Sequence, residues 1–186
     1  LIEGADEEDQ PTWNIWEYEV TTRQLRRVIQ SDIVAEEGHD VAPHYLPDGR
    51  IVFTSTRQRQ SRAVLLDEGK SQFAAQDEDG RDDAFVLHVM NADGTGLEQV
   101  SFNQSNDTDP AVLDDGRIVF SRWDNAGANN EINLYAMRPD GTQLELLYGA
   151  QSHATGTDDS DVHFLDARPT ASGKVIAPRR SPLSST

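Results

Sequence analysis

Short apolar segments alternate with polar turns along this chain, and their order occurs twice. Each copy contains a Pro-containing segment, an Asp-Gly turn before an apolar triplet, an alternating segment and a second Asp-Gly turn. Period-two alternation and Asp-Gly turns are typical of short antiparallel strands joined by tight hairpins. The corresponding segments are 40–43, 46–53, 87–95 and 97–100 in the first copy, and 107–110, 113–120, 134–142 and 144–147 in the second.

This repeat predicts a β-propeller, in which four-stranded blades surround a central axis. The Asp-Gly-Thr turns at 93–95 and 140–142 are 47 residues apart (140 minus 93), a period that suits one blade. The triplets 51–53 and 118–120 are wholly apolar, as strands must be when both faces of their sheet are covered. The predicted fold class is therefore all-β, a partial propeller of about three of six four-stranded blades, each an antiparallel meander.

The 186 residues are too few for a closed ring, because six blades of this period need about 280 residues. We therefore expect a single partial propeller domain over 1–186 that belongs to a longer protein. Its expected divisions are 13–29 (end of a blade), 38–100 (a blade with an insertion over 57–83), 105–148 (a blade), 160–178 (start of the next blade) and 179–186 (a tail).

Charge and composition exclude several classes of protein. Asp and Glu number 33 against 16 Lys and Arg, which gives a net charge of −17. Such a surface disfavours nucleic acid and anionic membranes and favours cations or basic partners, although it also serves solubility. The chain has no Cys, which excludes disulfides, thiolate metal sites and covalently attached haem in this segment. No apolar run reaches the roughly 18 residues of a membrane span, so we expect no membrane insertion.

The connections differ in length between the two ends of the predicted blades. In a four-stranded meander, the first and third turns lie at one rim, and the second turn and the link to the next blade lie at the other. The long connections hold 18 of the 33 acidic residues and six basic ones, so we expect the binding face at their rim. The short turns are 47–50, 91–96, 114–117, 138–143 and 171–174, and the long connections are 30–40, 57–83, 101–109, 122–131 and 148–164.

Several polar residues precede equivalent inner strands and are expected at the mouth of the central channel. Converging carboxylates and imidazoles there could hold a metal ion or a cationic group. Alternatively, Asp40 and Asp107 cap the turn into the strand by accepting backbone N–H groups, which we favour, and His153 and His163 are ordinary surface histidines. The candidates are His39, Asp40, Asp107, Asp109, Asp161, His163 and, in the last long connection, His153.

Two further segments have alternative interpretations. Arg122 and Trp123 leave the second strand of their blade, where they present a stacking pair at the rim or pack between blades. The segment 77–83 has the carboxylate density of a calcium loop, but its spacing does not match the helix-loop-helix pattern, and a solvated acidic loop is the preferred interpretation. The calcium candidates are Asp77, Asp79, Asp82 and Asp83.

The sequence contains no Gly-x-Ser-x-Gly elbow, phosphate loop or His-Glu-x-x-His zinc motif, so we assign no catalytic residue. The segments 46–55 and 137–142 resemble TolB-like, WD-related propeller repeats of bacteria. More narrowly, 109–123 is similar to the propeller middle domain of hydrazine synthase alpha subunit-like proteins. The resemblance implies a six-bladed propeller, usually in an exported or periplasmic protein. It does not extend to c-type haems, because this chain has no Cys-x-x-Cys-His.

The function expected from these features is that of a binding or scaffold module. It would be part of an exported propeller whose acidic rim contacts a protein partner or a cation, and whose ends contact the remaining blades of the parent propeller. The alternative is the propeller domain of a multidomain enzyme, either a hydrazine synthase-like redox protein or a peptidase gated by its propeller. A third alternative is that two copies pair to complete a ring.

Overall fold

Two complete four-stranded antiparallel sheets form the middle of the chain, which confirms the expected strand number and direction. The computed structural model describes residues 11–77, 80–126, 129–155 and 162–180. In both sheets the strand order follows the sequence, as in a meander. The first sheet contains β3 (Asp40–Tyr45), β4 (Ile51–Ser55), β5 (Val86–Met90) and β6 (Glu98–Gln99), and the second contains β7 (Asp107–Val112), β8 (Ile118–Ala126), β9 (Asn129–Met137) and β10 (Glu145–Tyr148).

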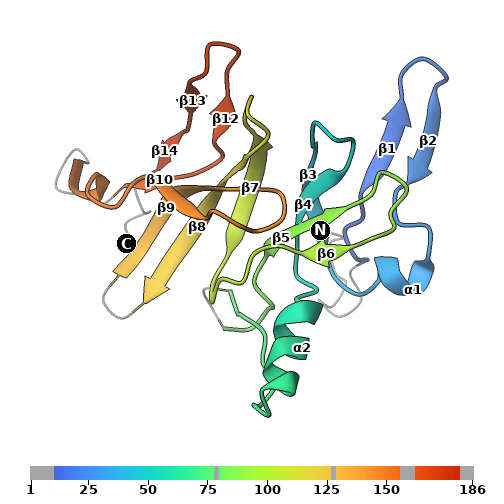
Figure 1. The fold of residues 1–186 in the computed structure, drawn as a ribbon, viewed down its shortest axis with the longest axis horizontal. Coiled ribbons are helices and arrows are strands. Elements are labelled where there is room, and N and C mark those ends of the chain that lie inside the picture. Colours follow the sequence, from blue (N-terminus) through green and yellow to red (C-terminus); the bar gives the residue numbers. More distant parts are fainter. Residues whose placement is uncertain (1–10, 78–79, 127–128, 156–161, 181–186) are drawn as a thin grey trace, which may run out of the picture.

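Smaller two-stranded pairings flank the complete sheets. On the N-terminal side, β1 (Trp16–Glu19) pairs with β2 (Gln24–Arg27). On the C-terminal side, β11 (His163–Phe164) pairs with β14 (Arg179–Arg180), and β12 (Arg168–Pro169) pairs with β13 (Val175–Ile176). Residues 179 and 180, which were expected in a tail, form the separate short strand β14. Figure 1 shows β1–β2 on the right, the β3–β6 sheet in the middle, and the β7–β10 sheet on the left with β12–β13 above it.

Helices occur in the long connections. The helix α1 (Asp32–Ala35) lies between β2 and β3, α2 (Arg59–Asp67) lies in the expected insertion, and the short 3-10 helix η2 (His153–Thr155) follows β10. In Figure 1 the β1–β2, β3–β4 and β12–β13 turns are at the top and α2 is at the bottom. None of the α2 residues is buried, so this helix adds to the surface rather than to the core. Within the described ranges, no helix has the length and apolar character needed to span a membrane.

The core consists of three apolar clusters, each formed between neighbouring sheets. This arrangement explains why the β4 and β8 triplets are apolar throughout, since each sheet is covered on both faces. The cluster between the two complete sheets contains Leu46, Val52, Leu87, Val89, Val100, Ile118, Phe120 and Met137. The cluster towards β1–β2 contains Ile15, Val28, Ile29, Ala35, Ile51, Phe53 and Met90, and the cluster towards β11–β13 contains Ala111, Val119, Leu134, Val162, Phe164 and Ala167.

The first strand of each sheet has the same irregularity. The β3–β4 register shifts between Val41 and His44, and the β7–β8 register shifts between Thr108 and Ala111. Within these shifts, Ala42 and Asp109 both have a φ of 52°. Asp166, between β11 and β12, has a φ of 50°. A bulge at this point turns the strand locally, and its recurrence shows that the three segments are structurally equivalent.

Candidate functional site

A buried acid–arginine pair lies at the start of β3. The guanidinium of Arg57 donates from Nε to Oδ1 of Asp40 at 3.2 Å and from Nη2 to Oδ2 at 2.5 Å. Neither side chain is more than 1% exposed. Arg57 also donates to Ser55 Oγ at 3.0 Å and to the Val34 carbonyl at 2.9 Å. All three nitrogens of this guanidinium are therefore bound to acceptors inside the protein.

The start of β7 has the same kind of pair. Arg122 donates from Nε to Oδ1 of Asp107 and from Nη2 to Oδ2, both at 2.8 Å. The Arg122 guanidinium carbon also lies 5.5 Å from the ring centroid of Phe120 and 5.1 Å from that of Tyr135. Arg122 thus stacks on aromatic rings of its own sheet while it holds the buried carboxylate.

These contacts change the interpretation of the two aspartates. Burial raises the pKa of Asp40 and of Asp107, and the hydrogen bonds from the paired arginines oppose that rise. A carboxylate held by a guanidinium through both oxygens is a strong and geometrically specific pair. Neither interpretation drawn from the sequence, a metal ligand or a turn cap, describes these groups, because both carboxylates bind arginine instead.

The residue before each inner strand joins its sheet to the preceding one. In all three places a side-chain acceptor receives the backbone N–H of a residue on the preceding sheet, and we call these bonds the inter-sheet latches. They are Trp13 N to His39 Nδ1 (3.1 Å), Phe85 N to Asn106 Oδ1 (2.8 Å) and Ile132 N to His163 Nδ1 (3.1 Å). The backbone completes two of them, since Asp40 N donates to Trp13 O at 2.9 Å and Asp107 N donates to Phe85 O at 2.7 Å. His39 and His163 therefore have structural roles between sheets.

His153 and Trp123 are also engaged inside the protein. His153 is only 4% exposed, in contrast to the surface position expected for it. Its Nε2 lies 2.8 Å from Asn133 Oδ1, and its Nδ1 contacts the Val162 carbonyl. Trp123 is buried and donates from Nε1 to Asn130 Oδ1 at 2.6 Å. The packing interpretation therefore applies to Trp123, and neither ring is presented at the rim.

The remaining acidic candidates do not form a recognisable metal site. Asp109 is half-buried, and its Oδ2 accepts the Thr108 hydroxyl at 3.2 Å. Asp77 Oδ1 accepts the Arg81 and Asp82 backbone N–H groups at 3.0 and 3.3 Å, and Asp83 is ion-paired to Arg62. No group of three or more His, Asp or Glu is placed to hold a metal ion in the part of the chain that the structure describes. Asp79 and Asp161 lie outside the described residues.

Exposed apolar side chains are more numerous at the rim of the long connections than at the rim of the short turns. The long connections present large apolar side chains that are more than half exposed. The five short turns at 47–50, 91–96, 114–117, 138–143 and 171–174 present none among the described residues, and the β1–β2 turn at the same rim presents one, Val20. The exposed side chains of the long connections are Ile33, Val64, Leu66, Phe73, Phe102 and Tyr148.

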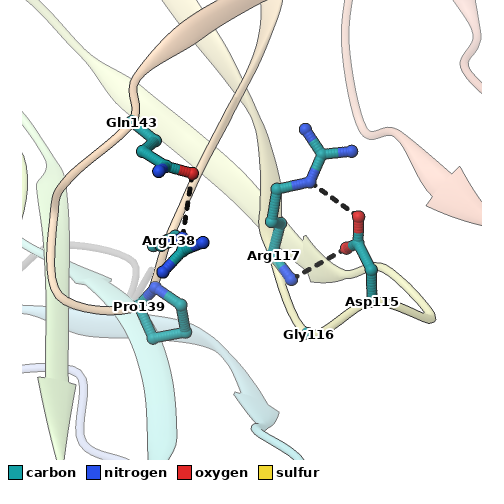
Figure 2. A pocket seen from close by; sticks show the side chains of 6 residues that line it. All are labelled: Asp115, Gly116, Arg117, Arg138, Pro139 and Gln143. Carbon is teal, nitrogen blue, oxygen red and sulfur yellow. Dashed lines mark hydrogen bonds and ion pairs between the residues drawn. The ribbon is translucent and has the colours of Figure 1, made fainter.

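An open pocket of about 480 Å³ lies at the short-turn rim, opposite the long connections. Its lining comes from the turns after β7 and β9 (Figure 2). Arg117 is ion-paired to Asp115 at 2.7 Å and to Glu145, and Arg138 donates to Gln143 Oε1 at 2.9 Å. Hydrogen bonds from the Arg117 backbone and side chain lower the pKa of Asp115, so this carboxylate stays ionised. The pocket contains no nucleophile beside a general base, so it offers no arrangement for covalent catalysis.

Comparison with protein-family models and with curated proteins gives no match. Among solved structures, the chain is similar to Kuenenia stuttgartiensis hydrazine synthase, with a TM-score of 0.61 and 18% sequence identity over 90% of this chain. It is also similar to a putative TolB from Agrobacterium tumefaciens, with a TM-score of 0.55 and 19% identity over 90% of this chain. The chain spans 26% and 50% of those two chains, respectively. The resemblance to TolB-like and hydrazine synthase chains stated from the sequence is confirmed at the level of structure.

Sequence reasoning missed the partners of its own candidates. Arg57 was not singled out, yet it binds Asp40. One signal was present: each copy of the repeat has an arginine shortly after its apolar triplet. The acceptor before the inner strand gave no such signal, because it is His in two places and Asn in the third.

Proposed function

We propose that this chain is a binding module that contacts a protein partner through the rim of its long connections. The observation that carries the proposal is the group of exposed apolar side chains Ile33, Val64, Leu66, Phe73 and Phe102 on that rim. Contiguous apolar groups within a polar surround are typical of protein interaction surfaces, and Val64 and Leu66 lie on one exposed helix, α2. The short turns of the opposite rim present one such side chain among the described residues, Val20 in the β1–β2 turn.

The net charge of the long connections indicates which kind of protein partner they would bind. The connections 30–40, 57–83 and 101–109 contain 13 acidic and five basic residues. One of the five, Arg57, is buried and paired with Asp40. A partner with apolar and basic groups complements this surface, and charge complementarity speeds its association at low salt. A protein is favoured over a simple cation because Asp40 and Asp107, the buried carboxylates near this rim, are occupied by arginine.

A second candidate function rests on the similarity to a much longer chain. This chain matches 26% of the hydrazine synthase chain, so it could serve as one propeller domain of a multidomain enzyme. The rim surface would then contact another domain or subunit of that enzyme. Export to the periplasm, expected from the resemblance, remains a prediction.

NMR chemical-shift mapping with a synthetic peptide tests whether the rim of the long connections binds a partner. We expect a helical peptide of Leu and Lys to shift the backbone ¹⁵N–¹H signals of residues 59–67, 73 and 102, and to leave those of 48–49 and 115–116 unchanged. A peptide with Glu in place of Lys should not bind. Increasing salt should weaken the binding, because the charges involved are exposed.

Replacement of exposed side chains provides the matched control. The triple variant Val64→Ser, Leu66→Ser, Phe73→Ser should bind the Leu-Lys peptide at least tenfold more weakly. Val20→Ser, also at an exposed apolar residue but outside this rim, should bind as the parent does. Unchanged affinity in the triple variant, or shifts confined to the short turns, would contradict the proposal.

A further inference from the structure

The last long connection packs against the second sheet around the side chain of His153. This side chain, at the start of η2, is buried. The connection passes close over β9, because a Cβ added to Gly149 would lie 1.9 Å from Asn133 Oδ1. Val162 N donates to His153 O at 3.0 Å, which brings the two sides of the connection together. Both nitrogens of the His153 ring face polar atoms of these neighbours, and the identity of those atoms shows where the ring carries protons.

The first ring nitrogen faces the amide oxygen of Asn133. His153 Nε2 lies 2.8 Å from Asn133 Oδ1. The orientation of this amide is fixed from its other side, because Asn133 Nδ2 donates to Asp124 Oδ2 at 2.8 Å. The same carboxylate oxygen accepts the Tyr135 hydroxyl at 3.0 Å. A carboxylate accepts and does not donate, so the amide nitrogen points to Asp124 and the amide oxygen points to His153. Nε2 must therefore carry a proton.

The second ring nitrogen faces a backbone carbonyl. His153 Nδ1 contacts the carbonyl oxygen of Val162. Because a carbonyl oxygen only accepts, Nδ1 must also carry a proton. A neutral imidazole has one proton and would leave one of the two acceptors facing a nitrogen lone pair. Only the imidazolium cation donates on both sides.

The titratable groups around the ring are compatible with a positive charge. Glu131 Oε2, on β9, lies 3.5 Å from His153 Nε2, and an opposite charge at this distance opposes the penalty of burying a cation. The ring centroid of His163, on β11, lies 6.1 Å away, but its Nδ1 accepts a backbone N–H, so this ring stays neutral. The third such group among the described side chains is Asp124 on β8, which lies behind Asn133.

Other histidines of the chain have different partners and provide a contrast. His39 and His163 accept a backbone N–H at Nδ1, so each carries its proton on Nε2. His88 Nδ1 lies 3.1 Å from a backbone carbonyl, so its proton is on Nδ1, and burial lowers the pKa of His88 to about 4. Of these four histidines, His153 is the one with an acceptor at each ring nitrogen.

We propose that His153 is held as the imidazolium cation and that its second proton fastens the last long connection to the second sheet. Loss of that proton leaves one acceptor facing a lone pair, so the ring keeps either Asn133 or Val162 and releases the other. The connection is therefore fastened while the ring is doubly protonated and loosens as the pH rises. This device concerns the connection itself and does not depend on the partner proposed for the rim.

NMR spectra of the histidine rings test the protonation directly. Two-bond ¹H–¹⁵N correlation spectra of the ¹⁵N-labelled chain at pH 7 show which ring nitrogens carry protons, and the spectrum of His153→Gln assigns the His153 signals. We expect both nitrogens of His153 to be protonated. The same spectrum should show His39 and His163 protonated at Nε2 and His88 at Nδ1. A single protonated nitrogen at His153 would overturn the proposal.

The variant Asn133→Ala tests the origin of the second proton. It removes the acceptor opposite Nε2, so the ratio of cation to neutral ring at pH 7 should fall about tenfold, with the remaining proton on Nδ1. Asn130→Ala is the matched control, because Asn130 lies on the same strand but bonds to Trp123. If Asn133→Ala does not fold, Glu131→Gln should lower the same ratio. A ring that stays doubly protonated in Asn133→Ala or, where that variant does not fold, in Glu131→Gln would contradict the proposal.

Amide hydrogen exchange at Val162 tests the fastening, since its N–H bonds to His153 O. His153→Gln can donate to one of the two acceptors but not to both, so exchange at Val162 at pH 7 should be about tenfold faster than in the parent. His44→Gln, at a half-buried histidine of β3, should leave that rate unchanged. An unchanged rate in His153→Gln would show that the second proton does not fasten the connection.

Discussion

The two complete sheets each bury an aspartate–arginine pair, but the arginine stands at a different position in each. Both bury an aspartate at the start of the inner strand, and both neutralise it with an arginine that follows the second strand's apolar triplet. In the second sheet the arginine is Arg122, which is the register partner of Asp107. In the first sheet the register partner of Asp40 is Ser55, and the arginine is Arg57, two residues farther along.

The difference follows from what comes after the second strand. In the second sheet, β8 and β9 continue as one ladder as far as Ala126 and Asn129. In the first sheet the ladder stops at Ser55, and the insertion with α2 begins. Gln58, near the start of the insertion, then binds its interior and its end, because its Nε2 donates to the Ala75 and Ala84 carbonyls at 2.9 and 2.8 Å. Arg57 and Gln58 together anchor the insertion of the first sheet. The second sheet has no such insertion, because β8 and β9 continue as one ladder at the same place.

Breaking the two buried pairs should give the largest effects. Removing one partner of a buried ion pair leaves an uncompensated charge and costs about 3–5 kcal/mol of unfolding free energy. We expect Arg57→Met to lie at the upper end of that range, because Arg57 also holds Ser55 and the Val34 carbonyl. Arg122→Met should lie at the lower end, since water reaches its 11% exposed side chain. Urea unfolding followed by circular dichroism measures both.

A double variant shows whether the cost comes from the orphaned carboxylate. Asp40→Leu combined with Arg57→Met removes both charges, and it should regain most of the stability lost by Arg57→Met alone. If Arg57→Met costs less than about 1 kcal/mol, the pair is not the buried contact described here.

The pH dependence of the unfolding free energy tests a second pair of equivalent positions in the two sheets. His88 faces Phe53 in the first sheet, and Tyr135 faces Phe120 in the second. Burial lowers the pKa of His88 to about 4, and burial together with Asp124 raises the pKa of Tyr135 to about 12. Unfolded histidine takes up a proton near pH 6.5, so the unfolded state binds more protons and stability falls as the pH drops from 6.5 towards 4. The expected loss between pH 7 and pH 5 is about 2 kcal/mol.

The variant His88→Gln isolates this contribution. It places a polar side chain without a titrating group at the same position in β5, so the part of the pH dependence due to His88 should disappear. Unfolding of both proteins at pH 7, 6 and 5 gives the comparison. An identical loss of stability in parent and variant would show that His88 is not protonated differently in the folded and unfolded states.

Much of the strand pattern was predictable because it is encoded locally. Asp-Gly turns and apolar triplets fix hairpins within a few residues, and the four-stranded sheets followed from them. The helix α2 was not predicted, because none of its residues is buried and its apolar residues form one short run, 63–66, rather than recurring at helical spacing. The candidate residues Asp40 and Asp107 were expected just before the inner strands and are the first residues of β3 and β7. Their partners Arg57 and Arg122 stand at different offsets from the turn glycines. One copy of the repeat therefore does not show which arginine pairs with the aspartate of another copy.

The smallest loss of stability is expected at the inter-sheet latch of Asn106, the one latch whose acceptor is an amide oxygen rather than a histidine ring nitrogen. Asn106 accepts the Phe85 N–H at 2.8 Å, whereas His39 and His163 fill the same role with a ring nitrogen. Asn106→Ala removes the acceptor and should cost about 1 kcal/mol, because the backbone N–H loses its only side-chain acceptor in that latch. Asn106→His should keep the bond and cost less. Amide hydrogen exchange at Phe85 reports on the bond directly: it should accelerate in the Ala variant and stay slow in the His variant, and equal acceleration in both would show that His and Asn are not interchangeable here.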